Sequence, residues 1–266
     1  MIRTLFGILC IACITGIAGS ITLHAQDGEE DEFEYVSENP PYYGLGAGYM
    51  RVLMFPDYEP IDSVSRDLGL GDFSGPLHMD VFGITFTPGF IPNLRFGFYG
   101  GLGTTQLTRQ MILRDDTVAR TMYLTSVFGA LQVDYALQIS PAFTIFAGGM
   151  LGYGRNTLGA SQTRITGARF SDVFNGPLFQ ADTVASLENL NRFARALSYH
   201  IFIYPSINFE YTLTPNIMMR LGGGYNTSLR VTPWSDEGGV ELLDPKPISV
   251  NGLAAQIGIF VGLFQH

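Results

Sequence analysis

The sequence predicts an all-β fold, namely an eight-stranded antiparallel up-and-down transmembrane β-barrel with short periplasmic turns and long outer loops. Eight segments of the 266-residue chain alternate apolar side chains with polar residues or glycine, which is the pattern of strands with two different faces. The segments span roughly 9–16 residues, and a tilted strand needs about 9–11 residues to cross a bilayer. The connections alternate strictly between short and long, as they do in membrane barrels.

The composition supports this class and argues against others. Charged residues make up 15 % of the chain and apolar residues 46 %, so the chain can bury enough surface to fold. The net charge of −9 repels phosphate, which argues against nucleic acid as a partner. After Pro41 no apolar run reaches the roughly 18 residues that a membrane-spanning helix requires. A large soluble β domain and a barrel in a membrane remain.

Residues 1–25 have the features of a secretory signal peptide. A basic residue lies near the start, residues 4–21 form an apolar run, and Ala25 is a small residue at the expected cleavage position. An uncleaved membrane anchor is the alternative interpretation, because the run is just long enough to span a bilayer. Both cysteines of the chain, Cys10 and Cys13, lie in this segment. The mature chain is therefore expected to hold no disulfide and no thiolate metal site.

Residues 26–41 are predicted to form an acidic, flexible leader before the barrel domain, which we place at residues 42–264. The stretch from Asp27 to Glu38 contains seven acidic residues, and two prolines follow it. A run of like charges repels itself and remains solvated. A tail that binds cations or a partner is the alternative interpretation.

The clearest of the eight predicted strands is Leu197–Thr212. Its odd-numbered positions are apolar and most of its even-numbered positions are polar, so one face suits lipid and the other suits the barrel interior. A soluble lipocalin-like barrel is the alternative fold, but its outer faces would carry charge. The other predicted strands are Tyr43–Met54, His78–Thr87, Leu94–Thr104, Met122–Leu137, Phe143–Tyr153, Ile217–Tyr225 and Val250–Phe264.

The connections indicate which end of the barrel faces which compartment. Short turns with proline or asparagine are predicted at residues 88–93, 139–141 and 213–216. The other connections are longer, and an even number of strands leaves both termini on the short-turn side, which is the periplasmic side. The long connections have about 23, 17, 40 and 24 residues and follow Met54, Thr104, Tyr153 and Tyr225.

The chain resembles the small eight-stranded outer-membrane β-barrels of the OmpA/OmpX type, including the Bacteroidota-like outer-membrane β-barrel domain proteins. The resemblance covers roughly residues 41–264 and depends on strand number, alternation and loop asymmetry. It implies a monomer in the cell outer membrane, in contact with membrane lipid and lipopolysaccharide. It also implies insertion by the outer-membrane barrel assembly machinery.

The C-terminal segment has the spacing polar-x-Gly-x-x-apolar-x-apolar that such barrels present to this machinery. Aliphatic residues take positions where aromatic residues are common, and the chain continues for two residues beyond its last phenylalanine. The residues of this predicted assembly signal are Gln256, Gly258, Val261, Leu263 and Phe264.

The inward faces of the predicted strands carry charged residues. Arg95 and Arg220 lie close to short turns and Glu210 precedes one, so all three are expected at a similar depth. An eight-stranded barrel is just wide enough for side chains to fill it. Paired charges and amides would plug the lumen, whereas a gated path for protons or ions is the alternative. The predicted polar network comprises Arg95, Asp134, Gln132, Asn208, Glu210, Arg220 and Gln256.

Three functions are compatible with this interpretation. A structural, adhesive or surface-binding role through the long outer loops is favoured, and a narrow channel for small solutes or hydrophobic ligands is the first alternative. The second alternative is a lipid A hydrolase. Ser198 and His200 share one strand face, and Glu188 or Asp182 in the preceding loop is a possible third member of a triad. The pair faces inward, away from lipid, so we expect that the protein is not an enzyme. We also expect no cofactor and no metal centre.

Two kinds of outer segment are candidates for external contacts. Within residues 156–196 and just beyond, apolar residues recur at helical spacing from Val184 to Leu197, which predicts a short amphipathic helix over the barrel mouth. Other loops carry acidic residues for divalent cations, but without a recognisable ligand spacing. These acidic residues are Asp57, Glu59, Asp62, Asp115 and Asp116.

Overall fold

The strands of this chain close on themselves into a barrel. The structure is a computed structural model and describes residues 42–113, 116–164, 192–242 and 250–264. The predicted signal peptide and the predicted acidic leader lie outside these residues, so both stay predictions.

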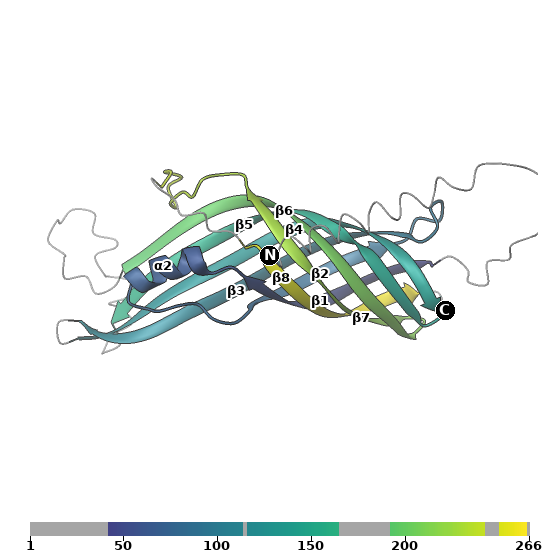
Figure 1. Cartoon of the computed structure of the whole chain (residues 1–266), viewed down its shortest axis with the longest axis horizontal. Helices are drawn as coiled ribbons and strands as arrows, with labels where there is room; N and C mark the ends of the chain where they lie inside the picture. Colours follow the sequence, from purple (N-terminus) through teal and green to yellow (C-terminus); the bar gives the residue numbers. More distant parts are fainter. Residues whose placement is uncertain (1–41, 114–115, 165–191, 243–249, 265–266) are drawn as a thin grey trace, which may run out of the picture. The chain divides into compact units, whose positions relative to one another are not determined.

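Eight antiparallel strands follow one another around the barrel in chain order, and the last pairs back with the first (Figure 1). At this closing seam Gly44 pairs with Phe264 and Pro56 pairs with Gly252. The structure therefore confirms the predicted eight-stranded up-and-down barrel. The strands are β1 (Gly44–Pro56), β2 (Leu77–Phe86), β3 (Leu94–Leu113), β4 (Asp116–Ser140), β5 (Phe143–Arg164), β6 (Arg192–Thr214), β7 (Ile217–Arg230) and β8 (Gly252–Phe264), with the helix α2 (Glu59–Asp67) between β1 and β2.

All connections at one end of the barrel are short, as the sequence predicts. Residues 87–93 join β2 to β3, and pairs of residues join β4 to β5 and β6 to β7. Asn93 ends the first of these turns with a φ of 62°, in the left-handed region that asparagine tolerates. Its side-chain oxygen accepts a hydrogen bond from the backbone N of Tyr42 at 3.0 Å. The turn thereby holds the start of the barrel domain in place.

At the other end, β3, β4, β5 and β6 run far beyond their predicted bounds. The predicted loop of about 17 residues after Thr104 is wrong, because β3 continues to Leu113 and β4 begins at Asp116. Threonine and glutamine are frequent in this stretch, so the apolar–polar alternation that marks the barrel strands fades. We call the extended part of these four strands the outer wall, and it comprises residues 105–113, 116–124, 158–164 and 192–196.

The prediction of a helix from Val184 to Leu197 is wrong at its C-terminal end, because β6 begins at Arg192. The rest of that segment lies outside the described residues. A helix occurs instead in the loop after β1, where α2 has acidic residues in its first turn and Arg66 in its last. This order of charges suits the helix dipole. Among the residues that the structure describes, no helix has the length and apolar character to cross a membrane.

The helix α2 packs on the inward face of the outer wall. Ile61 is fully buried and shares one apolar cluster with Met122 and Leu124 of β4. Arg120 of the wall donates a hydrogen bond to the carbonyl of Leu68, directly after the last turn of the helix. A cation at a helix C-terminus is favourable, so this contact joins α2 to the wall.

The outward faces of the strands change character at the level of Thr104 and Thr125, whose hydroxyls lie 3.0 Å apart across β3 and β4. On the short-turn side of this level the outward side chains are apolar and exposed, as at Phe98 and Leu131. On the other side many of them are threonine or glutamine. The apolar stretch of β3 begins at Leu94, which matches the about 9–11 residues that span a bilayer. The exterior is therefore that of a membrane-crossing barrel with the outer wall in the external medium.

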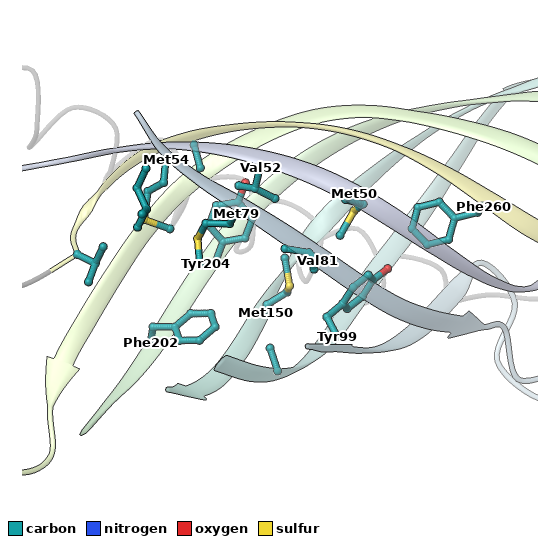
Figure 2. Close-up of a cluster of buried hydrophobic side chains, with 14 of the residues drawn as sticks. Met50, Val52, Met54, Met79, Val81, Tyr99, Met150, Phe202, Tyr204 and Phe260 are labelled. Carbon is teal, nitrogen blue, oxygen red and sulfur yellow. The ribbon is translucent and has the colours of Figure 1, made fainter. Parts of the chain in front are cut away.

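The interior is filled by side chains of two kinds. Charged and amide side chains lie next to the short turns. Apolar side chains from most of the strands form a cluster in the rest of the interior, part of which Figure 2 shows. Small residues make room for large ones in this narrow space. A Cβ at Gly222 on β7 would collide with the side chain of Asn208 on β6, so the glycine allows the amide to lie across β7.

Candidate functional site

The charged residues of the interior form one ion-paired cluster beside the short turns. Arg95 donates to the two carboxylate oxygens of Glu210, at 2.6 and 2.7 Å, and to Asp134 at 2.6 Å. Arg220 donates to Glu210 through Nε, also at 2.6 Å. Glu210 thus accepts hydrogen bonds from both arginines and is the centre of the cluster.

Strand register brings these side chains together. Arg95 on β3 lies directly opposite Asp134 on β4, and Glu210 on β6 lies directly opposite Arg220 on β7. Side chains that are opposite on one face of a sheet are close enough to interact. The hydrogen bonds from Arg95 to Glu210 then join the two pairs across the lumen.

The cluster is buried and electrically balanced. Arg95 and Arg220 are each 1 % exposed, and two equally buried carboxylates neutralise them. An unpaired buried charge is costly, whereas a pair with good geometry and further contacts offsets much of the desolvation. Aromatic rings supply those contacts: the guanidinium of Arg95 lies 3.5 Å from the centre of the Phe146 ring, and that of Arg220 lies 4.3 Å from the centre of the Phe260 ring.

Amide side chains extend the network. Gln132 donates to Asp134 at 3.0 Å, and Gln256 donates to Asn208. All seven residues of the predicted polar network are buried. The structure brings five of them into one hydrogen-bonded cluster and places the other two, Asn208 and Gln256, in a separate pair.

Sequence reasoning did not single out the aromatic partners of this cluster. Tyr99 accepts a hydrogen bond from Arg220 at 2.8 Å, and Phe146 and Phe260 lie against the arginines. The alternation in β3 does place Tyr99 on the same face as Arg95, which is the signal that was available. Which arginine it contacts depends on the opposite side of the barrel.

The residues of the predicted assembly signal lie on both faces of β8. Gln256 and Gly258 face the interior, whereas Val261 and Leu263 face outward and are 61 % and 68 % exposed. Phe264 faces inward and is 4 % exposed, so its ring is not on the face of the two aliphatic residues. The assembly role of this segment stays a prediction.

Ser198 and His200 both point into the barrel from β6. Ser198 donates its hydroxyl to the backbone carbonyl of Thr232 at 3.0 Å, and among the described residues the Nδ1 atom of His200 has no hydrogen-bond partner. Glu188 and Asp182 lie outside the described residues. In the part of the chain that the structure describes, no group of three or more His, Cys, Asp or Glu residues could hold a metal ion.

A charged pair on the barrel exterior was not predicted. Arg51 on β1 and Asp80 on β2 are register partners whose side chains form a salt bridge at 2.5 Å, and Tyr49 also donates to Asp80. Asp80 lies opposite Leu102, two residues from Thr104, so the pair is near the outer rim of the apolar band. An unpaired charge at this depth costs up to about 1 kcal/mol, and the salt bridge reduces this cost for both residues.

The chain matches no protein-family model and no curated protein. Solved structures of outer-membrane proteins are similar in fold. Ail, the attachment invasion locus protein of Yersinia pestis, is 12 % identical over 85 % of this chain and 99 % of its own, with a TM-score of 0.32. A major outer membrane protein from Thermus thermophilus is 12 % identical over 82 % and 99 %, with a TM-score of 0.41. CarO2 from Acinetobacter baumannii is 10 % identical over 84 % and 100 %, with a TM-score of 0.31.

The fold and its exterior define the class of protein. The chain is an eight-stranded β-barrel of the outer-membrane type, because its strands close, its outward band is apolar and its interior charges are paired. Barrels of this type lie in bacterial outer membranes, which is the predicted location. At such low identities and TM-scores, the solved structures carry no inference about what this chain binds or does.

Replacing Glu210 with glutamine is expected to destabilise the barrel by about 3–5 kcal/mol, because two buried arginines lose their shared carboxylate. Urea unfolding in detergent micelles, followed by the loss of heat-modifiable gel migration, measures the free energy of unfolding. Glu237→Gln is the matched control, since Glu237 also pairs with an arginine, Arg195 at 2.9 Å, but is exposed. That control is expected to lose less than about 1 kcal/mol. Equal losses in the two variants would contradict a central role for Glu210.

Replacing Asp80 with leucine is expected to destabilise the barrel by up to about 1 kcal/mol, because Arg51 is left unpaired near the rim of the lipid-facing band. The double variant Arg51→Leu/Asp80→Leu is expected to regain most of this loss, since an apolar pair suits the lipid-facing surface. Urea unfolding of both variants and of the unmutated protein in the same lipid measures the difference. A double variant that is less stable than Asp80→Leu would contradict this explanation of the loss by an unpaired charge.

Proposed function

We propose that this protein is a closed outer-membrane barrel with an adhesive or surface-binding role that its outer wall performs. The observation that carries the proposal is the length of the strands from β3 to β6. They have 20, 25, 22 and 23 residues, which is about twice what a bilayer requires. At about 3.3 Å per residue, residues 105–113 of β3 add about 30 Å of strand beyond Thr104. A barrel does not need a wall of this size to cross a membrane.

The outer wall has a strand edge that favours the binding of protein. β2 pairs with β3 only as far as His78 opposite Thr104. From Thr105 to Leu113, the only strand that β3 pairs with among the described residues is β4. The other edge of this segment presents backbone N–H and C=O groups to the medium, and such an edge can take up an added strand. The partner that fits is an external protein with an extended segment.

The interior supports a closed barrel over the channel alternative. Two guanidinium groups, two carboxylates and the rings of Phe146 and Phe260 occupy the lumen beside the short turns. Each of these charges is held by an ion pair at 2.6 Å. A solute would have to break buried ion pairs to pass, and this costs several kcal/mol.

Catalysis is no part of the proposed function. The hydroxyl of Ser198 donates to a backbone carbonyl, which leaves it without the activating imidazole that a serine nucleophile needs. Both Ser198 and His200 point away from lipid, which disfavours the lipid A hydrolase alternative.

The closed lumen predicts that the unmutated protein forms no large, steady channels in planar lipid bilayers. Arg220→Ala is expected to raise the conductance for small ions above that of the unmutated protein, because it removes a buried side chain from the cluster. Arg66→Ala is the matched control, since Arg66 pairs with Asp72 at the exposed surface. Large, steady channels in the unmutated protein would refute the closed barrel.

The surface-binding role predicts that cells displaying the protein adhere to immobilised extracellular proteins more than cells with an empty vector. Collagen, fibronectin and mucin, each coated separately, are suitable probes. The variant Gln106→Lys/Gln110→Lys puts two charges on the edge strand β3, and charged edge residues deter strand addition. We expect this variant to lose most of the adherence.

The control for this experiment is Thr117→Lys/Ala119→Lys, which adds the same charge to β4. This strand is not at the edge of the wall, because it lies between β3 and β5. It is expected to keep its adherence if the edge is the binding element. Gel migration with and without boiling verifies that every variant is a folded barrel. Displayed and folded unmutated protein that binds none of the coated proteins above background would count against the role.

A further inference from the structure

A narrow cavity lies inside the barrel, on the outer side of the charged cluster. Its lining is mostly apolar and comes from strands on all sides of the barrel. In the structure it has room for a few water-sized molecules. Four of its lining residues are methionines, which Figure 2 shows along the interior: Met50, Met54, Met79 and Met150.

Three polar atoms on the lining of this cavity lack partners. The hydroxyl of Tyr204, the Oε1 atom of Gln256 and the Nδ1 atom of His200 have no hydrogen bond among the described residues. All three side chains are more than nine-tenths buried. Buried polar groups are nearly always hydrogen-bonded, and leaving one unpaired costs about 1–3 kcal/mol. A molecule in the cavity that pairs with these atoms would remove this cost.

Two of the three groups lie in the same sector of the barrel. Gln256 on β8 is the register partner of Gly222 on β7, and the ring of Tyr204 on β6 lies against Gly224. Gly224 on β7 leaves room for the ring of Tyr204, and Gln256 reaches towards Gly222, where it donates to the side chain of Asn208. Tyr204 belongs to the apolar cluster of the interior, where Figure 2 labels it.

The lining determines the chemistry of the ligand. The described residues that form it include no Asp, Glu, Lys or Arg, so neither an acid nor an amine would find a counter-charge there. A tyrosine hydroxyl donates and an amide oxygen accepts a hydrogen bond. A ligand hydroxyl accepts from the first and donates to the second. The rest of the ligand has to be apolar and slim.

The methionines explain how such a narrow cavity can admit a ligand. A methionine side chain has three rotatable bonds and a polarisable sulfur, so it adapts its shape to an apolar partner at low cost. With four of them around one cavity, the lining can open along its length without a change in the strands. An unbranched alkyl chain is the apolar shape that requires the smallest opening.

We propose that the outer half of the barrel binds an uncharged, unbranched aliphatic alcohol. Its hydroxyl lies between Tyr204 and Gln256, and its chain lies along Met50, Met79 and Met150. The site is internal and is separate from the outer wall. The test of alcohol binding is therefore independent of the test of the surface-binding role.

The test is a titration of the full barrel in lipid nanodiscs with 1-hexanol, read from the NMR signals of methionine methyl groups labelled with carbon-13. The methyl signals of Met50, Met54, Met79 and Met150 are expected to shift and to saturate. Met219 is 41 % exposed on the lipid-facing surface and reports alcohol that has merely partitioned into the bilayer. Met218 is buried but does not line the cavity, so its signal is expected to stay in place.

Matched probes separate the contribution of each group. Hexane is expected to bind about 3- to 10-fold more weakly than 1-hexanol, because it makes no hydrogen bond. Hexanoate and hexylammonium are expected to cause no saturable shift. Tyr204→Phe is expected to weaken 1-hexanol part of the way towards hexane, because the hydrogen bond to Gln256 remains, and to leave hexane unchanged. Tyr153→Phe, on the barrel exterior, is the control that leaves both affinities unchanged.

Three results would overturn the proposal. The first is a shift that never saturates or that is equal at Met219, which would mean partition into lipid only. The second is no shift at all, which would mean that the cavity holds water alone. The third is equal binding of 1-hexanol and hexane to the unmutated protein. This last comparison needs no variant, so it decides the question even if Tyr204→Phe fails to show heat-modifiable migration.

Discussion

A lipid bilayer offers no water to backbone N–H and C=O groups, so a strand that crosses it must be paired on both edges. This chain meets that constraint by pairing β8 with β1 along the full length of β1, from Gly44 to Pro56. Closure with eight strands then imposes the rest of the structure. One face of every strand meets lipid and is apolar, and the other meets a lumen so narrow that side chains must fill it.

Filling this lumen is a problem of both volume and charge. Large side chains need small residues beside them, as Asn208 needs Gly222. The arginines can be buried only because Asp134 and Glu210 lie within hydrogen-bonding distance. The polar half next to the short turns is thus held by ion pairs. The outer half is packed loosely enough, with methionines, to leave a cavity with unpaired polar atoms on its lining.

The constraint ends where the bilayer ends. Beyond Thr104, β3 has no partner on its β2 side among the described residues, which water permits and lipid would not. The wall of β3 to β6 is held instead by its own ladder and by α2 on its inward face. Arg120 joins the wall to the end of that helix. The same four strands therefore have two parts, one that closes a barrel and one that stands open to the medium.

Alternation was enough to predict the eight strands, the short turns and the inward faces of Arg95, Asp134, Glu210 and Arg220, because a period of two reports directly on two environments. It failed for the outer wall, where threonine and glutamine suit water on either face, and for α2, whose partner surface belongs to β4. Contacts between side chains of different strands could not be predicted from alternation either. Arg51 and Asp80 are paired by register, and Arg95 reaches a glutamate 115 residues away. The order of residues along this chain decides which face each side chain takes. Which side chains meet on that face depends on register and closure. Only the closed barrel brings strands on opposite sides of the lumen close enough for their side chains to touch, as Arg95 of β3 touches Glu210 of β6.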